Sequence, residues 1–153
     1  MLRHSTRVAV VAAALAISSM GVVGLSTTVA SASSPTVTCT GFTSNVKGVG
    51  SLTKCTDTKN TGGSGKAVAN IAKSTAVITW NKTGTTTESY KETGVTPNKC
   101  ASGSTEIKEV STTTGGTGAA LKSIPKGQVA TAYLCLNLSK GTVSLLPGTK
   151  YQV

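Results

Sequence analysis

The sequence predicts an all-β protein, an antiparallel β-sandwich of about eight or nine strands, with a small β-barrel as the alternative. β-Branched and aromatic residues alternate with polar ones over short segments, and glycine-containing turns separate these segments. No long segment shows the 3.6-residue period of an amphipathic helix. Sandwiches and small barrels share this pattern. Lys91 and Lys108, at strand positions, would protect an exposed sheet edge, which favours the sandwich.

The chain begins with the pattern of a secretory signal peptide. Arg3 and Arg7 precede an apolar segment over 8–17, and Ala30-Ser31-Ala32 has the small residues of a cleavage site. We therefore expect a signal peptide over residues 1–32 and a secreted domain over residues 33–153, extracellular or associated with the cell wall. The weaker alternative is a retained membrane anchor, which serine and threonine residues disfavour because they interrupt so short a span. No membrane span is expected after processing.

The first strands of the mature domain are expected over 36–43 and 46–56. A polar, glycine-rich loop follows over 57–66. This loop is not expected to bind phosphate, because neither a Gly-Lys-Ser/Thr sequence nor a βαβ pattern accompanies it. The short apolar segment 67–72 fits either a strand or one helical turn.

The clearest element is a β-hairpin around the tetrapeptide 81–84, because β-branched and aromatic residues alternate on both sides of it. We expect all four residues to form the loop, which places Trp80 opposite Thr85 and leaves Glu88 in solvent, away from the apolar face. A three-residue loop would instead put Glu88 beside Ile78. A carboxylate on that apolar face would need a partner, so the four-residue loop is favoured.

The remaining segments are strands separated by turns. The most apolar of them, 128–138, has apolar residues on both faces, so we place it in the centre of the sheet. Glycines at 115, 116 and 118 are expected to interrupt the chain. In order, the expected elements are the hairpin running on to Val95, a turn over 96–104, a strand over 105–113, a strand end or brief helix over 119–124, and strands over 128–138, 142–146 and 149–153.

The core is expected to be thin and to need covalent reinforcement. Removing the first 32 of 153 residues leaves 121, of which 22 are valine, isoleucine, leucine or phenylalanine. At that fraction a chain buries little apolar area to offset its conformational entropy. Four cysteines in an exported chain predict two disulfides. Of the three connectivities that four cysteines allow, we favour Cys39 with Cys55, on neighbouring strands, and Cys100 with Cys135 by elimination.

No enzymatic chemistry, metal site or cofactor is expected. The only histidine, His4, belongs to the leader, so a nucleophile would lack its usual base, and there is no Cys-x-x-Cys motif for a metal. Glu88 and Glu92 would lie about 13 Å apart on one strand, too far for a glycosidase pair. Glu88 across from Glu106 remains an alternative, but solvated surface charge is the preferred interpretation. The other acidic residues are Asp57 and Glu109.

The mature domain is basic, with 13 lysines, no arginine and five acidic residues. Lysine is a hydrated point charge, and these lysines are scattered singly, so the charge is expected to keep the surface soluble rather than to recognise a nucleic acid. The expected partner is extracellular, such as an anionic cell-wall polymer or a glycan, and the domain is expected to be a monomer.

Trp80 and Tyr90 are the candidate binding residues, because exposed aromatic rings form platforms for sugars. Core packing of Trp80 beside Ile78 is the favoured alternative. A small-molecule carrier would need a cavity, and this chain has few large residues to line one. A protease inhibitor would need a stiff exposed loop, for which 95–100, with its proline, is the one candidate.

Short motifs spread over the mature domain carry a resemblance to known proteins. They are Gly48-x-Gly50-x-Leu52-x-x-Cys55, Ile78-Thr79-Trp80 followed by Gly84-Thr85-Thr86, Cys100-x-x-Gly103-Ser104-x-Glu106, and Val143-Ser144-Leu145-x-Pro147-Gly148-Thr149. With them the sequence resembles a group of small, uncharacterised secreted proteins of actinobacteria, which have a leader, four cysteines and a threonine- and glycine-rich β-domain. The resemblance implies no activity. In size, leader and cysteine count the chain also resembles the actinomycete carriers that hold enediyne chromophores in an immunoglobulin-like sandwich, although it shares no binding motif with them and is basic.

The expected function is therefore a non-enzymatic, secreted binding module of the extracellular space or the cell envelope. The alternatives are a carrier of a small apolar ligand and a protease-inhibitor-like protein.

Overall fold

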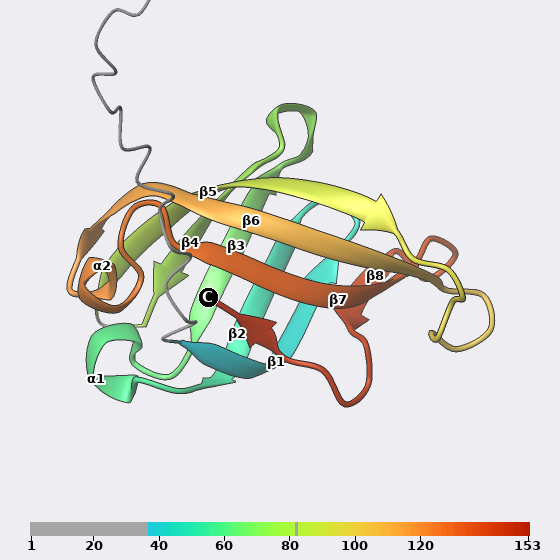
Figure 1. Ribbon diagram of the computed structural model, residues 1–153, viewed down its shortest axis with the longest axis horizontal. Helices are drawn as coiled ribbons and strands as arrows, with labels where there is room; N and C mark the ends of the chain where they lie inside the picture. Colours follow the sequence, from blue (N-terminus) through green and yellow to red (C-terminus); the bar gives the residue numbers. More distant parts are fainter. Residues whose placement is uncertain (1–36, 82) are drawn as a thin grey trace, which may run out of the picture. The chain divides into compact units, whose positions relative to one another are not determined.

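The computed structural model describes residues 37–81 and 83–153, and the expected signal peptide lies outside them. This part of the chain contains nine strands and three short helices (Figure 1). In chain order they are β1 (Thr38–Asn45), β2 (Val49–Cys55), α1 (Thr58–Thr61), β3 (Gly65–Asn70), the 3-10 helix η1 (Ile71–Lys73), β4 (Thr75–Trp80), β5 (Gly84–Gly94), β6 (Thr105–Gly118), α2 (Ala120–Ser123), β7 (Val129–Asn137), β8 (Thr142–Leu145) and β9 (Tyr151–Gln152).

The strands form an antiparallel barrel that eight of them close. Each strand from β1 to β7 pairs with the next, and β8 closes the ring by pairing with β1. The ninth strand, β9, shares the position of β8 between β7 and β1: β9 pairs with Thr38 and Cys39 of β1, whereas β8 pairs with 43–45 of the same strand. One barrel position is therefore divided between two short strands by the turn over 146–150.

The prediction of an all-β, antiparallel fold is confirmed, and the arrangement is the alternative one, the barrel rather than the sandwich. A closed barrel has no edge strands, because every strand is paired on both sides. Lys91 and Lys108 therefore do not guard an edge. Each belongs to the long β5–β6 pair, in which Lys91 is opposite Val110 and Lys108 is opposite Thr93.

The β4–β5 hairpin has the three-residue loop, so the favoured register is wrong. Trp80 pairs with Gly84 and Ala76 pairs with Glu88, which turns Glu88 onto the apolar inner face. Gly84 is needed inside the strand rather than in the loop: its φ is +119°, and a Cβ there would collide with the carbonyl of Thr117 on β6. The expected interruption at Gly115, Gly116 and Gly118 is also wrong, because β6 continues to Gly118 alongside β5. A Cβ at Gly116 or Gly118 would collide with the backbone carbonyl of Thr85 or Thr83.

One end of the barrel is filled with side chains. Trp80 is 2% exposed there, and its indole N–H donates a hydrogen bond to the Thr86 hydroxyl over 3.1 Å. Ala120 and Ile124, from α2 and its C-cap, are fully buried in the same apolar cluster. Helices α1 and α2 lie beside each other at the left-hand end in Figure 1. Asp57 joins them by accepting a hydrogen bond from the Ser123 hydroxyl. This end is therefore closed by packing.

The structure contains two disulfides, Cys39–Cys55 and Cys100–Cys135, which is the pairing that the sequence favoured. The first joins directly opposite residues of β1 and β2. The second ties the 95–104 loop to β7. In that loop the Lys99 N–H donates a 2.7 Å hydrogen bond to Glu106, which is 1% exposed. Glu106 is thus buried, not a solvated surface charge, and its strand position alternates with that of the inward-facing Ile107 and Glu109.

Candidate ligand-binding cavity

The other end of the barrel is hollow. A cavity of about 240 Å³ lies inside it, bounded by residues from every strand. Large apolar side chains form much of its wall: Phe42, Leu52, Ile78, Ile107, Leu134, Leu136 and Val143. An eight-stranded barrel has an interior just wide enough to be filled by side chains or to hold one small ligand.

The cavity exists because several inward positions carry small side chains. Ala67 and Ala69 on β3 and Ala76 on β4 line it. From the sequence, the shortage of large apolar residues argues against a lined cavity. In a closed barrel the same shortage has the opposite effect and favours a cavity. Closure fixes the interior volume, so small residues on the inner face leave space unfilled.

Exposed apolar residues surround the mouth of the cavity. Val46, Ile71 and Leu138 line the cavity and are 42%, 58% and 74% exposed. They come from the β1–β2 turn, from η1 and from the β7–β8 turn, which meet at the open end of the barrel. A ligand would therefore enter past an apolar rim.

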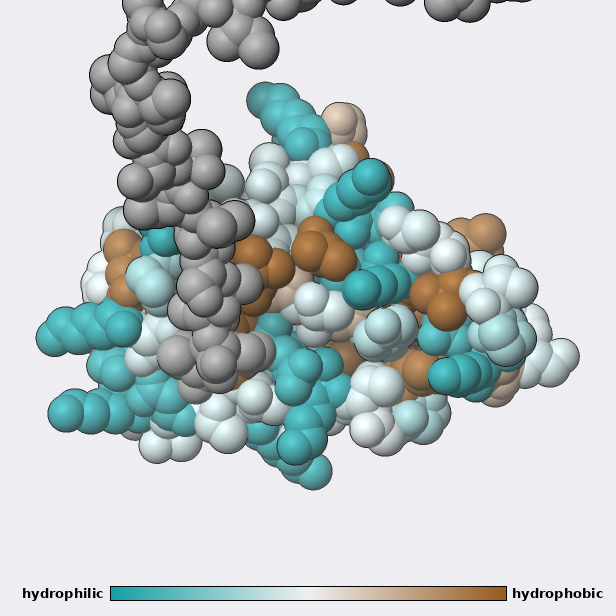
Figure 2. Space-filling model, viewed as in Figure 1, coloured by the Kyte–Doolittle hydropathy of each residue, from teal (hydrophilic) through white to brown (hydrophobic). Residues whose placement is uncertain are grey.

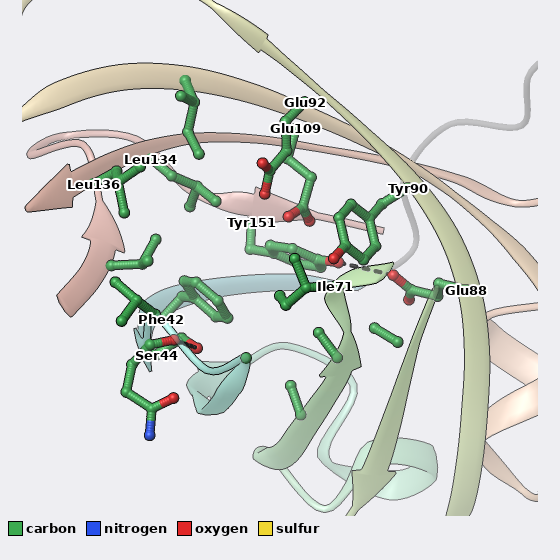
Figure 3. A pocket seen from close by; sticks show the side chains of 18 of the residues that line it. Phe42, Ser44, Ile71, Glu88, Tyr90, Glu92, Glu109, Leu134, Leu136 and Tyr151 are labelled. Carbon is green, nitrogen blue, oxygen red and sulfur yellow. Dashed lines mark hydrogen bonds between the residues drawn. The ribbon is translucent and has the colours of Figure 1, made fainter. Parts of the chain in front are cut away.

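Glu88 lies deep in the cavity wall and is 2% exposed. Its Oε2 atom accepts hydrogen bonds from the Ser111 hydroxyl at 2.7 Å and from the Tyr151 hydroxyl at 2.9 Å. Figure 3 shows the Tyr151 ring reaching Glu88 across the cavity wall. Burial raises the pKa of Glu88, and the two hydrogen bonds oppose that shift. The partner that a carboxylate on this face requires is thus supplied by β6 and β9.

Two more glutamates continue the same wall toward the mouth. Glu92 on β5 and Glu109 on β6 are direct cross-strand partners, and both line the cavity. Desolvation, followed by the charges of Glu88 and Glu92, raises the pKa of Glu109 to about 7. Like charges placed opposite each other on a sheet are destabilising, so this pair is not explained by stability.

Aromatic rings accompany the carboxyl groups. Tyr90 lies on the cavity wall between Glu88 and Glu92 along β5, and Figure 3 shows its ring beside them. Desolvation and the charges of Glu92 and Glu109 raise the pKa of its hydroxyl. Tyr151 stacks on Phe42 with ring centroids 6.0 Å apart. The site therefore combines apolar, aromatic and acidic groups.

The two predicted binding residues lie in different parts of the barrel. Tyr90 lines the cavity, whereas Trp80 is buried at the packed end and is no exposed platform, because its ring fills the core and its N–H is bonded to Thr86. The sequence interpretation missed Glu88 and Glu109. The signal for Glu88 is the three-residue hairpin loop, which turns this side chain onto the apolar face.

No family model matches the chain, and no curated protein or solved structure matches it significantly. Within 37–81 and 83–153 no helix is long and apolar enough to cross a membrane. Over the same residues no group of three or more histidine, cysteine or acidic side chains could hold a metal ion. The fold and the cavity thus define a small closed β-barrel with an accessible interior.

Proposed function

We propose that this protein is an exported, non-catalytic carrier that binds one small, largely apolar molecule inside its barrel. The single observation behind the proposal is the cavity itself: a closed barrel packed at one end and hollow at the other, with an apolar rim around its mouth. Proteins otherwise fill their interiors to a high packing density, so an open interior of this size calls for an occupant.

The size of the cavity limits the ligand. Its volume of about 240 Å³ is smaller than the roughly 300–1,000 Å³ of sites that hold drug-sized molecules. The packed end, with Trp80 and Ile124 in its core, leaves one direction of entry. The proposed ligand is therefore a compact molecule that enters through the mouth.

The sequence favours a cell-envelope binding module and gives the carrier as an alternative. The cavity makes the carrier the better-supported of these two functions. The binding module would have used Trp80 and Tyr90 as aromatic platforms for a sugar, but Trp80 is 2% exposed and Tyr90 lines the cavity. The cavity gives the carrier a binding site. Export is supported by the basic, apolar and small-residue pattern of residues 1–32 and by the two disulfides, which are typical of proteins from oxidising compartments.

The proposal is tested by titrating the mature protein with N-phenyl-1-naphthylamine, a neutral apolar dye that fluoresces in apolar surroundings. Ala76 and Val77 are neighbours on β4, but Ala76 lines the cavity and Val77 is 41% exposed. We expect wild-type protein and the control Val77→Phe to bind the dye, and Ala76→Phe to lose binding because the new ring occupies the cavity.

Two further steps make the result decisive. Circular dichroism verifies folding, and if Ala76→Phe fails to fold, Ala69→Phe on the adjacent strand fills the same cavity. Native mass spectrometry of protein from its own host's medium is expected to show excess mass from a bound molecule. Absence of dye binding by the wild-type protein, or equal binding by a folded cavity-filling variant, would refute the carrier.

A further inference from the structure

Acidic side chains line the interior of this barrel, whereas basic side chains lie outside it. The chain has only five acidic residues, and three of them line the cavity: Glu88 and Glu109 inside it and Glu92 at its exposed mouth. None of its 13 lysines does, as far as the described residues extend. Figure 2 shows strongly hydrophilic side chains projecting from the outer surface, between smaller hydrophobic patches. The interior of a basic protein is therefore acidic.

One of these carboxyl groups is incompletely paired. The two hydrogen bonds to Glu88 both reach Oε2, and its Oε1 has no hydrogen-bond partner among the described residues, although it is buried. The hydroxyls of Thr83 and Thr113 share this property, but Glu88 alone of the three can carry charge. A buried carboxylate oxygen without a donor is costly, and so is a buried charge without a counter-charge.

The acidic groups occupy one side of the cavity, although Ser44 and Asn45 of β1 and Tyr151 of β9 also line it. Strands β5 and β6 contribute Glu88, Tyr90, Glu92 and Glu109, whereas β7 and β8 contribute leucines and Val143. Figure 3 shows Leu134 and Leu136 on the opposite side from Glu88 and Tyr90. A ligand that fits this interior has a polar side that donates hydrogen bonds and an apolar side.

We propose that the ligand is a small amphipathic cation, a protonated amine on an apolar body, whose ammonium group binds the carboxylates of Glu88 and Glu109. This inference rests on the proposed carrier function and adds the chemical class of its ligand. The ammonium supplies the N–H donor that Glu88 Oε1 lacks and the positive charge that the cavity lacks. The apolar body lies against the leucines of β7.

Other ligand classes fit less well. An anion such as a fatty-acid carboxylate would face three glutamates and, among the described residues, no lysine. A neutral apolar molecule would leave Glu88 Oε1 unpaired. A metal ion lacks a ligand cluster among the residues described. The faces of Tyr90 and Tyr151 add attraction for an organic cation, since aromatic rings attract ammonium groups.

The test compares three probes with similar apolar bodies and different head groups: 2-phenylethylamine, 2-phenylethanol and phenylacetate. Their dissociation constants are measured with the mature protein by calorimetry at pH 8. There the amine is protonated, and Glu109, with a pKa of about 7, is largely ionised. We expect the amine to bind at least ten times more tightly than the alcohol, and the anion to bind most weakly.

Variants assign the preference to the named carboxylates. Glu88→Gln and Glu109→Gln are expected to reduce the amine-to-alcohol affinity ratio several-fold. Lys91→Gln is the control, because it also changes the charge by one unit but lies at an exposed position of β5 that does not line the cavity. General damage to the barrel would weaken amine and alcohol alike and leave their ratio unchanged, so the ratio separates recognition from structure.

Each outcome decides the matter. If the alcohol binds as tightly as the amine, or if the anion binds best, the cationic ligand is refuted while the carrier function stands. An unchanged ratio in both glutamate variants refutes the assignment to Glu88 and Glu109. If none of the three probes binds, the inference also fails, and the naphthylamine titration then decides the carrier function separately.

Discussion

Glu109 should make the folded domain less stable as the pH rises from about 4.5 to about 7. In the unfolded chain its carboxyl has an ordinary pKa near 4.5, whereas desolvation and the charges of Glu88 and Glu92 raise the pKa in the folded barrel to about 7. Between these values the folded state binds the proton more tightly than the unfolded state. The free energy of unfolding therefore falls with increasing pH across this window.

The size of the effect follows from the shift. A change from 4.5 to about 7 is roughly 2.5 pKa units, and each unit corresponds to about 1.36 kcal/mol, so ionisation of Glu109 costs the folded state up to about 3 kcal/mol. Glutamine is similar in shape and cannot ionise. We expect Glu109→Gln to exceed the wild-type stability by up to about 3 kcal/mol at pH 8 and to match it near pH 4.

Urea denaturation at constant ionic strength, in steps from pH 4 to pH 8, measures this difference. Lys91→Gln, outside the cavity, changes the net charge by one unit in the opposite direction, so an effect of net charge alone would move its stability the opposite way. Glu88 remains in Glu109→Gln, and its own raised pKa acts in the same direction, so a smaller fall in stability with pH should persist in the variant. Parallel pH profiles for wild type and Glu109→Gln would show that Glu109 titrates like a solvated carboxyl group and would refute the reasoning.

Two more predictions concern the packed end and the strands. Trp80→Phe should lower the free energy of unfolding by about 1–3 kcal/mol, because it removes the donor to the buried Thr86 hydroxyl, but should leave naphthylamine binding intact. If the folded variant does not bind the dye, Trp80 contributes to the binding site and its assignment to the packed end alone is wrong. Gly84→Ala should cost at least about 2 kcal/mol in urea denaturation, because its φ is +119° and a Cβ would collide with β6. Gly94→Ala, at the other end of β5 with no atom near its Cβ position, should change stability by less than about 0.5 kcal/mol, and equal costs at the two glycines would contradict this account.

Most strands could be located from the sequence because alternation of side chains is a local property. The segments predicted over 36–43, 105–113 and 128–138 contain or overlap β1, β6 and β7 within a few residues. The one-turn helix α1 was missed within the predicted loop 57–66. Its signals were present: the Asp57 side chain caps it, and Gly62 ends it with a φ of +67°.

The register of the β4–β5 hairpin could not be predicted from its local sequence. Both loop lengths fit the local sequence, and the choice between them depends on whether Glu88 finds a partner on the apolar face. Its partners, Ser111 and Tyr151, are 23 and 63 residues away in the sequence. A register that depends on such distant side chains cannot be chosen from the hairpin alone.

The sequence by itself determined most of the strands, the lack of a long helical period in the mature domain and the expectation of two disulfides, because each depends on nearby residues or on composition. Only the tertiary structure decided between sandwich and barrel, since that depends on whether β8 returns to β1. Closure also fixed the interior volume, left it partly empty beside the alanines of β3 and β4, and turned three glutamates into it. The candidate site is a product of closure, because its residues come from strands that are separate in sequence and share an interior only when the ring is complete.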